Sequence, residues 1–181
     1  MENIMITAEE KKLILEVFKN IRNNLKKYMT DRNFIMSNAQ IFTFLLYAPV
    51  CLAIASDGRV DIEEMKILDK MAKAIDVNKL DIDLVELLSF AAEPAEVMTN
   101  EEFNIRIGSE LLFLSRNIDK YEDNIINAIK ELLRFDKNPQ ADTSLTKTFS
   151  KLMDSIIENN ASLNKEKEKE KLDQFKQKIG L

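Results

Sequence analysis

The chain of 181 residues contains only three glycines and three prolines. Strands of antiparallel sheets are joined by tight turns, and those turns need residues that tolerate positive φ angles. Three glycines cannot supply the turns of a sheet protein of this length. Leu, Ile, Lys, Glu and Ala are common instead, a mixture that favours helices. The sequence therefore predicts an all-α protein.

Capping boxes mark the predicted helix starts. In such a box an N-cap Ser, Thr or Asp is followed three residues later by Glu or Gln, and the pair satisfies backbone N–H groups at the helix start. Five pairs fit this pattern: Thr7 with Glu10, Ser37 with Gln40, Asp61 with Glu64, Thr99 with Glu102, and Asp119 with Glu122. Apolar residues then recur every three or four positions, which is the spacing of one helix face.

One predicted helix, residues 38–55, is apolar on nearly all sides. Such a helix belongs in the middle of a bundle. Pro49 lies inside it and lacks a backbone N–H, so we expect a kink there. The single cysteine, Cys51, falls in the same run. It allows no disulfide within the chain and no cysteine metal site, and we expect its thiol to be buried.

The caps and apolar stripes together predict a single bundle of about seven helices over residues 1–160. Residues 161–181 form a separate charged helix or tail, in which Lys and Glu alternate from Lys165 to Lys171. Attractive charge pairs at i,i+3 and repulsive pairs at i,i+4 nearly cancel on such a helix. The segment ends in a short apolar stripe, Leu172, Phe175 and Ile179. This stripe docks either on the body of the protein or on a partner.

Charge and hydropathy limit the expected partners. The formal net charge is −5, whereas nucleic-acid-binding domains usually carry a strongly basic face. Residues 1–12 are polar and acidic, without a signal peptide. The longest apolar stretch, residues 41–55, is shorter than the roughly 20 residues that span a bilayer. We therefore expect a cytoplasmic protein that does not span a membrane, binds no nucleic acid, and has another protein as its partner.

No combination of residues in the sequence indicates an active site. The chain has no histidine, which removes the commonest general base and metal ligand. Cys51 consequently has no histidine to activate it as a nucleophile. A phosphate-binding loop needs more clustered glycines than this chain has. We predict no catalytic residues and a non-enzymatic protein; a small helical enzyme that uses carboxylates alone is a third alternative.

The turn between two predicted helices, Ala-Ser-Asp-Gly-Arg-Val-Asp-Ile-Glu-Glu at positions 55–64, allows two interpretations. In the structural one, Gly58 ends the first helix and Asp61 caps the second. In the functional one, the carboxylates of Asp57, Asp61 and Glu64 gather near one turn and bind a divalent cation, Ca²⁺ or Mg²⁺. Their spacing does not fit an EF-hand.

This segment, with an apolar helix before it and Ile67, Leu68 and Met71 after it, resembles the signature of TerB-like tellurite-resistance domains. Members show an Ala-Asp-Gly turn, then an apolar residue, then a Glu seven positions after the Asp. Here those positions are Ala55, Asp57, Gly58, Val60 and Glu64. The resemblance covers residues 47–72 closely. It implies an all-helical fold of repeated helix pairs and an acidic surface that binds metal.

An internal similarity extends the resemblance more loosely. An offset of 58 positions aligns residues 60–71 with residues 118–129, each following an apolar helix. A duplicated helix pair explains this match, and so does convergence of two capped amphipathic helices. The second segment has Ser115-Arg116 where the first has Asp57-Gly58.

Two hypotheses of function follow from the sequence. The leading one is a non-enzymatic TerB-like domain that binds a divalent cation through Asp57, Asp61 and Glu64 and acts in a stress-response or membrane-linked assembly. The alternative is a helical protein–protein interaction module in which the Asp-Gly turn is purely structural.

Overall fold

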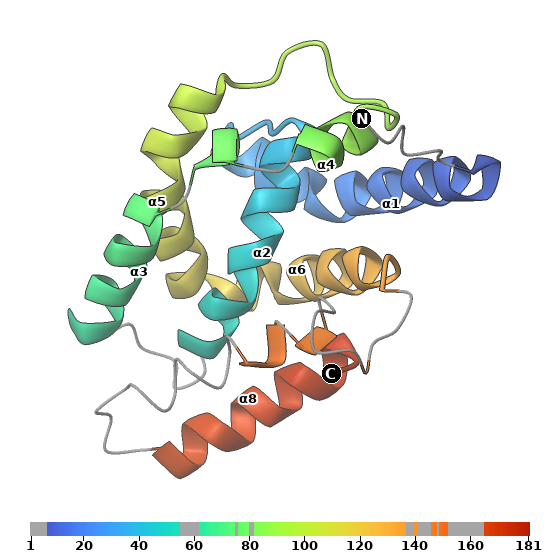
Figure 1. Cartoon of the computed structure of the whole chain (residues 1–181). Helices are drawn as coiled ribbons and strands as arrows, with labels where there is room; N and C mark the ends of the chain where they lie inside the picture. Colours follow the sequence, from blue (N-terminus) through green and yellow to red (C-terminus); the bar gives the residue numbers. More distant parts are fainter. Residues whose placement is uncertain are drawn as a thin grey trace.

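The computed structural model describes residues 7–54, 62–74, 76–79, 82–136, 140, 146–147, 149–151 and 165–181. Every regular element within these ranges is a helix (Figure 1), which confirms the predicted all-α class. The elements are α1 (Ala8–Arg32), α2 (Asn38–Ile54), α3 (Ile62–Ala74), the 3₁₀ helix η2 (Val77–Lys79), α4 (Ile82–Leu88), α5 (Asn100–Arg116), α6 (Ile118–Leu133) and α8 (Lys165–Ile179).

The apolar helix α2 lies at the centre of the bundle, as its composition predicts. It contacts α4, α5, α6 and α8, and it continues through Pro49 (Figure 1). Its side chains excluded from solvent include Ile41, Phe44, Leu45, Ala48, Val50, Cys51 and Leu52. The other strong pairings are α1 against α6 and α3 against α5.

Aromatic rings join four helices in the core. Tyr28 of α1 lies with its ring centroid 5.5 Å from Phe44 of α2 and 5.2 Å from Tyr121 of α6. Phe34, in the connection after α1, stacks on Phe103 of α5 at 5.7 Å. Aromatic pairs at these distances add about 0.5–1.5 kcal/mol to the burial of the rings themselves.

The predicted capping bonds form at Thr7, Ser37 and Thr99, where residues close in sequence determine the helix start. At Thr7 the hydroxyl accepts the Glu10 N–H at 3.1 Å, and the Glu10 carboxylate accepts the Thr7 N–H at 3.0 Å. Ser37 and Gln40 exchange the same pair of bonds at 2.9 and 3.2 Å. The Thr99 hydroxyl accepts the N–H three residues later at 3.1 Å.

The predicted cap at Asp119 is wrong. Helix α6 begins at Ile118, and Asn117 is its N-cap residue without a side-chain capping bond. The reason is the connection: α5 continues to Arg116, so a single residue separates the two helices. Ile118 is also buried, and that packing favours a helix start ahead of Asp119.

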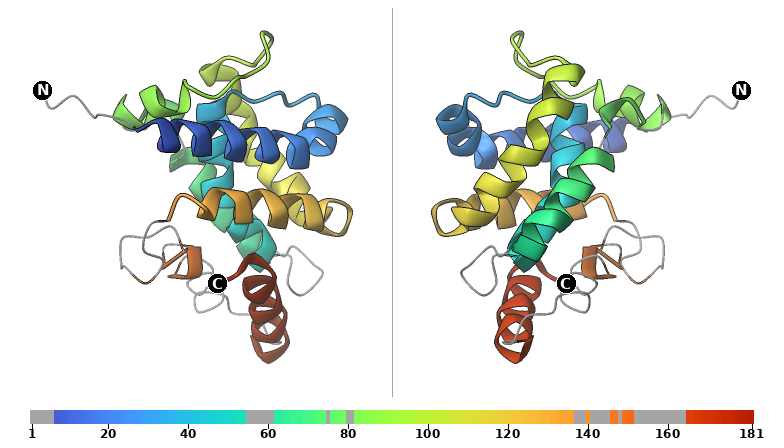
Figure 2. Two further views of the ribbon diagram at one scale, coloured as in Figure 1. Left: turned by 90° about the vertical axis from the view of Figure 1, so that its right-hand side faces the viewer. Right: turned by 90° about the vertical axis from the view of Figure 1, so that its left-hand side faces the viewer.

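The C-terminal region packs onto the bundle. Of residues 141–160, the last part of the predicted bundle, residues 146–147 and 149–151 are described and helical, and Phe149 is buried; the others lie outside the described residues. Helix α8 contacts α6 and α2 and lies at one end of the bundle (Figure 2). Its stripe is buried there: Leu172, Phe175 and Ile179. The Lys178 ammonium lies 2.8 Å from the Glu122 carboxylate.

Among the described helices, none has the length and apolar character that crossing a membrane requires.

Candidate functional site

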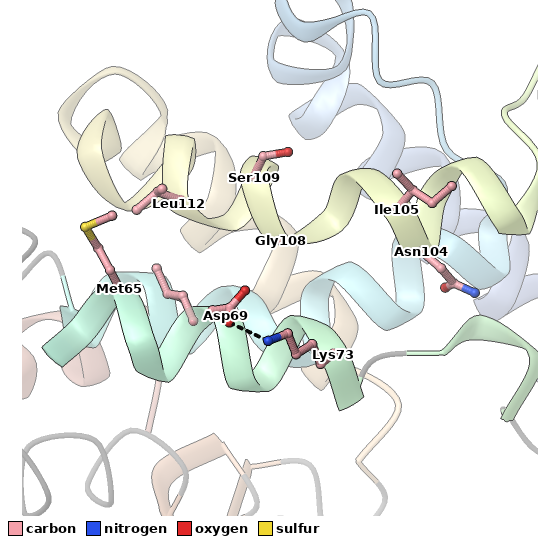
Figure 3. Close-up of a pocket in the computed structure, with 9 residues that line it drawn as sticks. Met65, Asp69, Lys73, Asn104, Ile105, Gly108, Ser109 and Leu112 are labelled. Atoms are coloured by element: carbon pink, nitrogen blue, oxygen red, sulfur yellow. Dashed lines mark ion pairs between the residues drawn. The ribbon is translucent and has the colours of Figure 1, made fainter. Parts of the chain in front are cut away.

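Helices α3 and α5 run side by side in opposite directions and enclose a groove of about 540 Å³ (Figure 3). We call it the α3–α5 groove. The side chains that line it are Met65, Leu68, Asp69 and Lys73 from α3 and Asn104, Ile105, Gly108, Ser109 and Leu112 from α5.

The groove exists because α5 places small residues where it faces α3. Gly108 has no side chain and Ser109 has a short one, and both lie between Ile105 and Leu112 (Figure 3). A glycine inside a helix costs about 0.5–1 kcal/mol relative to alanine. Gly108 thus weakens α5 locally while keeping the space between the helices open.

Large apolar side chains are exposed at the rims of the groove. Ile105 of α5 is 75% exposed, and Met65 of α3 is 36% exposed. Ile62, one turn before Met65, is 71% exposed. Single exposed apolar residues are ordinary on a protein surface, whereas exposed apolar residues that line a groove, as Ile105 and Met65 do at its two ends (Figure 3), are typical of an interaction site.

The acidic and basic residues of α3 are equal in number in its sequence: Glu63, Glu64 and Asp69 against Lys66, Lys70 and Lys73. The ionisable side chains of α3 that are described as exposed are Lys66, Asp69, Lys70 and Lys73. Lys73 and Asp69 form an ion pair at 2.9 Å, and both are well exposed, so the pair contributes little to stability. At the other end, the Arg116 guanidinium lies 3.5 Å from the Met65 sulfur. This local balance differs from the net charge of −5 of the whole chain.

A second polar cluster surrounds Glu110, which is only 2% exposed. Its Oε2 accepts the Tyr28 hydroxyl at 2.8 Å, and its two oxygens accept the Arg32 Nε and Nη2 groups at 3.0 and 3.1 Å. Arg106 Nη2 lies 3.4 Å from Oε1. The Arg32 guanidinium also stacks over the Phe113 ring at 3.6 Å. All of these groups are hydrogen-bonded or stacked within the cluster, so the cluster stabilises the packing of α1 against α5.

Burial keeps the Tyr28 hydroxyl and the Cys51 thiol protonated. Burial, with the neighbouring Glu110 carboxylate, raises the pKa of Tyr28 far above its ordinary value. Burial raises the pKa of the Cys51 thiol to about 12. Cys51 is fully buried, as predicted, and its thiol lies 3.5 Å from the Leu111 carbonyl oxygen. At neutral pH it is a protonated thiol and not an activated nucleophile.

The predicted metal ligands fall in and next to the α2–α3 connection. Asp57 and Asp61 lie outside the described residues, as does the predicted cap at Asp61. Glu64 lies in the first turn of α3 and is 1% exposed, on the same helix face as the buried Leu68. Within the described parts of the chain, no three acidic or cysteine side chains are grouped to hold a metal ion. The proposed ligand set therefore remains a prediction.

The groove was not predicted from the sequence, although two features of the α5 sequence indicate it. Ile105 is out of phase with the buried stripe of α5, which consists of Phe103, Ile107, Leu111 and Leu114. Gly108 interrupts a helix that is otherwise rich in good helix formers. An out-of-phase apolar residue three positions before a mid-helix glycine predicts an exposed apolar side chain beside a gap on the helix surface.

No protein-family model, curated protein or solved structure gives a significant match to this chain. The resemblance to TerB-like domains accordingly rests on the residues of the segment 47–72.

Proposed function

We propose that this chain is a non-enzymatic helical module that binds another protein through the α3–α5 groove. The observation that carries the proposal is the 75% exposure of Ile105 beside a groove of about 540 Å³. Covering one large apolar side chain contributes about 1.5–3 kcal/mol. Ile105 therefore offers a partner a binding contribution that the isolated chain leaves unused.

The character of the groove supports this role. Its volume lies within the range of roughly 300–1,000 Å³ that is usual for ligand sites, enough for several large side chains. Met65 is flexible and polarisable, and such side chains adapt to the shape of a partner. Asp69, Lys73 and Asn104 supply polar groups beside the apolar side chains, and such a combination is usual at protein interfaces.

The chemistry of the described residues supports a non-enzymatic role. The chain has no histidine. The Cys51 thiol, with its pKa raised to about 12 by burial, stays protonated at neutral pH. The Glu110 carboxylate is committed to Tyr28 and Arg32. These groups are the nearest to catalytic candidates in the described core, and each is better explained by packing.

The test compares two exposed apolar residues. Ile105→Asp places a charge in the groove, and Leu15→Asp places the same charge on α1, where Leu15 is 48% exposed. Both variants are expected to keep the wild-type circular dichroism spectrum. A protein captured from the source cells is purified and its affinity for each variant is measured. We expect Ile105→Asp to weaken the complex by about tenfold or more, because one buried apolar contact is lost. Equal affinity for both variants would contradict the proposal.

A second candidate function is divalent-cation binding at the turn before α3, as in a TerB-like domain of a stress-response assembly. The observation that favours it is the Glu64 carboxylate, almost fully removed from water in the first turn of α3. Carboxylate oxygens are the ligands that Ca²⁺ and Mg²⁺ prefer in proteins. In the sequence, Asp57 and Asp61 precede it by seven and three positions.

Calorimetric titration of the metal-free protein with Ca²⁺, Mg²⁺, Mn²⁺ and Zn²⁺ tests this second candidate. We expect saturable binding of Ca²⁺ or Mg²⁺ that Asp57→Ala abolishes, because the substitution removes one oxygen ligand. Asp69→Ala is the matched control, since Asp69 is exposed on the same helix and lies one turn further along. Unchanged binding in Asp57→Ala, or no binding of any ion, would exclude the site.

A further inference from the structure

We infer that α8 is a releasable helix, which undocks from α2 and α6 as a unit while the other helices stay folded and thereby uncovers the face beneath it. Helix α8 contacts α6 and α2 and extends away from one end of the bundle (Figure 2). Among its described side chains, the buried ones lie in its second half: Leu172, Phe175 and Ile179. Lys169 and Glu170, which precede them, are exposed.

The apolar attachment of α8 is small for the length of the helix. Leu172, Phe175 and Ile179 are the only apolar residues in its 15-residue sequence. Helix α6, with 16 residues, buries seven side chains. A helix as short as α8 is marginal in water without packing, and local opening needs least free energy where buried apolar contacts are few. We therefore expect α8 to open before α6.

Charge also holds α8 on the bundle. Its sequence has six lysines and four acidic residues, whereas the whole chain has 26 basic and 31 acidic residues. The helix is thus net positive and the rest of the chain net negative. The Lys178 ammonium lies 2.8 Å from the Glu122 carboxylate and 5.9 Å from the centre of the Phe175 ring. The Lys178 side chain is 55% exposed, so dissolved salt screens this attraction.

Native-state hydrogen exchange of the full chain in low urea tests the release. Relative to their intrinsic rates, the amides of α8 should exchange at least tenfold faster than those of α6. Their exchange should depend little on urea, because opening of α8 alone exposes little surface. Raising the salt concentration should increase the opening of α8 about two- to fivefold. Equal protection of α8 and α6 would overturn the inference, since α8 would then open only with the whole bundle.

Two lysine variants test the charged contact. Lys178→Ala removes the ion pair with Glu122 and should increase the opening of α8 about two- to fivefold. Lys169→Ala removes the same charge from an exposed position of the same helix and should leave the opening unchanged. Equal effects of the two substitutions would overturn the role of the Lys178 contact in holding α8.

A labelled synthetic peptide of residues 165–181 tests whether the uncovered face stays folded. The full-length Phe175→Ala chain should bind this peptide at least tenfold more tightly than the wild-type chain does, because its own α8 no longer competes. The same substitution in the peptide should abolish binding, whereas Asp173→Ala in the peptide should not change it. The Lys178→Ala chain, a milder variant, should bind the peptide about two- to fivefold more tightly than wild type. If neither chain variant gains affinity, the inference is overturned.

Discussion

Glu110 in the middle of α5 accepts two hydrogen bonds from Arg32, the last residue of α1, at 3.0 and 3.1 Å. Arg106, one turn before Glu110, donates to the backbone carbonyl oxygens of Arg32 and Asn33, each at 3.0 Å. These bonds hold the buried side of α5 against the end of α1. They thereby fix the wall on which Ile105 and Gly108 are presented to solvent.

Removing the Glu110 carboxylate should destabilise the fold. Glu110→Ala removes the acceptor of the Arg32 guanidinium and leaves the buried Tyr28 hydroxyl only the more distant Glu110 carbonyl oxygen at 3.4 Å, which we expect to cost about 3 kcal/mol. Arg32 is partly exposed and regains water, so a larger loss is not expected. Arg134→Ala, which breaks an exposed pair with Glu131, should change stability by about 0.5 kcal/mol or less. Urea unfolding followed by circular dichroism measures both, and equal effects would contradict the role of Glu110.

Helix α8 should depend on the apolar stripe that docks it. Phe175→Ala leaves a cavity where α8 meets the bundle, and truncation of a buried Phe costs about 3–5 kcal/mol. We expect this loss to appear as undocking of α8, because the helix carries few other apolar residues. Hydrogen exchange should then become faster throughout α8. Asp173→Ala, on the exposed face, should leave exchange unchanged; similar protection in both variants would show that the stripe does not hold α8.

The end of α1 depends on a left-handed residue. Asn33 has φ 48° and donates its N–H to the Thr30 carbonyl oxygen at 3.2 Å. Asn and Gly tolerate this conformation better than other residues. Asn33→Ala should lower the free energy of unfolding by about 1 kcal/mol, whereas Asn33→Gly should be close to neutral. If thermal unfolding shows the two variants to be equally destabilised, the backbone conformation is not the cause.

Stability should fall in alkaline solution because of Cys51. Burial raises its pKa from 9.0 to about 12. Below about pH 9 the thiol is protonated in both the folded and unfolded states, so its contribution is constant. Above that pH the unfolded thiol ionises while the folded one stays protonated. The free energy of unfolding should then fall by roughly 1 kcal/mol per pH unit.

Cys51→Ala is the control for this pH dependence. Tyr28, whose pKa burial also raises, adds a loss above its ordinary value of 10.0 in both proteins. Between about pH 8 and pH 10, denaturant titrations should therefore show a smaller loss for Cys51→Ala than for the wild type. The same slope in both would mean that the thiol is not protected from ionisation in the folded state.

The sequence predicts the helices well where the signal is local. Thr7 and Glu10 are three residues apart, so their capping box forms whatever the rest of the chain does. Asp119 has the same local pattern but fails, because the length of α5 leaves only Asn117 between the helices. Phe175 of α8 docks on the bundle through α2 and α6, which are distant in sequence. The apolar stripe of α8 by itself therefore could not decide between docking on the body of the protein and docking on a partner.

The candidate site was harder to predict for the same reason. Met65 lies beside Leu112, and Lys73 beside Asn104, only because α3 packs antiparallel to α5, a tertiary relationship that no periodicity encodes (Figure 3). The sequence instead directs attention to Asp57, Asp61 and Glu64, which lie close together along the chain. Of these, only Glu64 belongs to the described residues, and the cation hypothesis remains a proposal.

The most direct test of the α3–α5 groove as a docking surface is NMR of methyl-labelled protein titrated with its purified partner. We predict that the methyl resonances of Ile105, Met65 and Leu112 shift or broaden, because they come into contact with the partner. Leu15, a labelled residue on α1 that is 48% exposed, should keep its resonance. Shifts at Leu15 with unchanged signals from Ile105 and Met65 would contradict the account and place the interaction elsewhere.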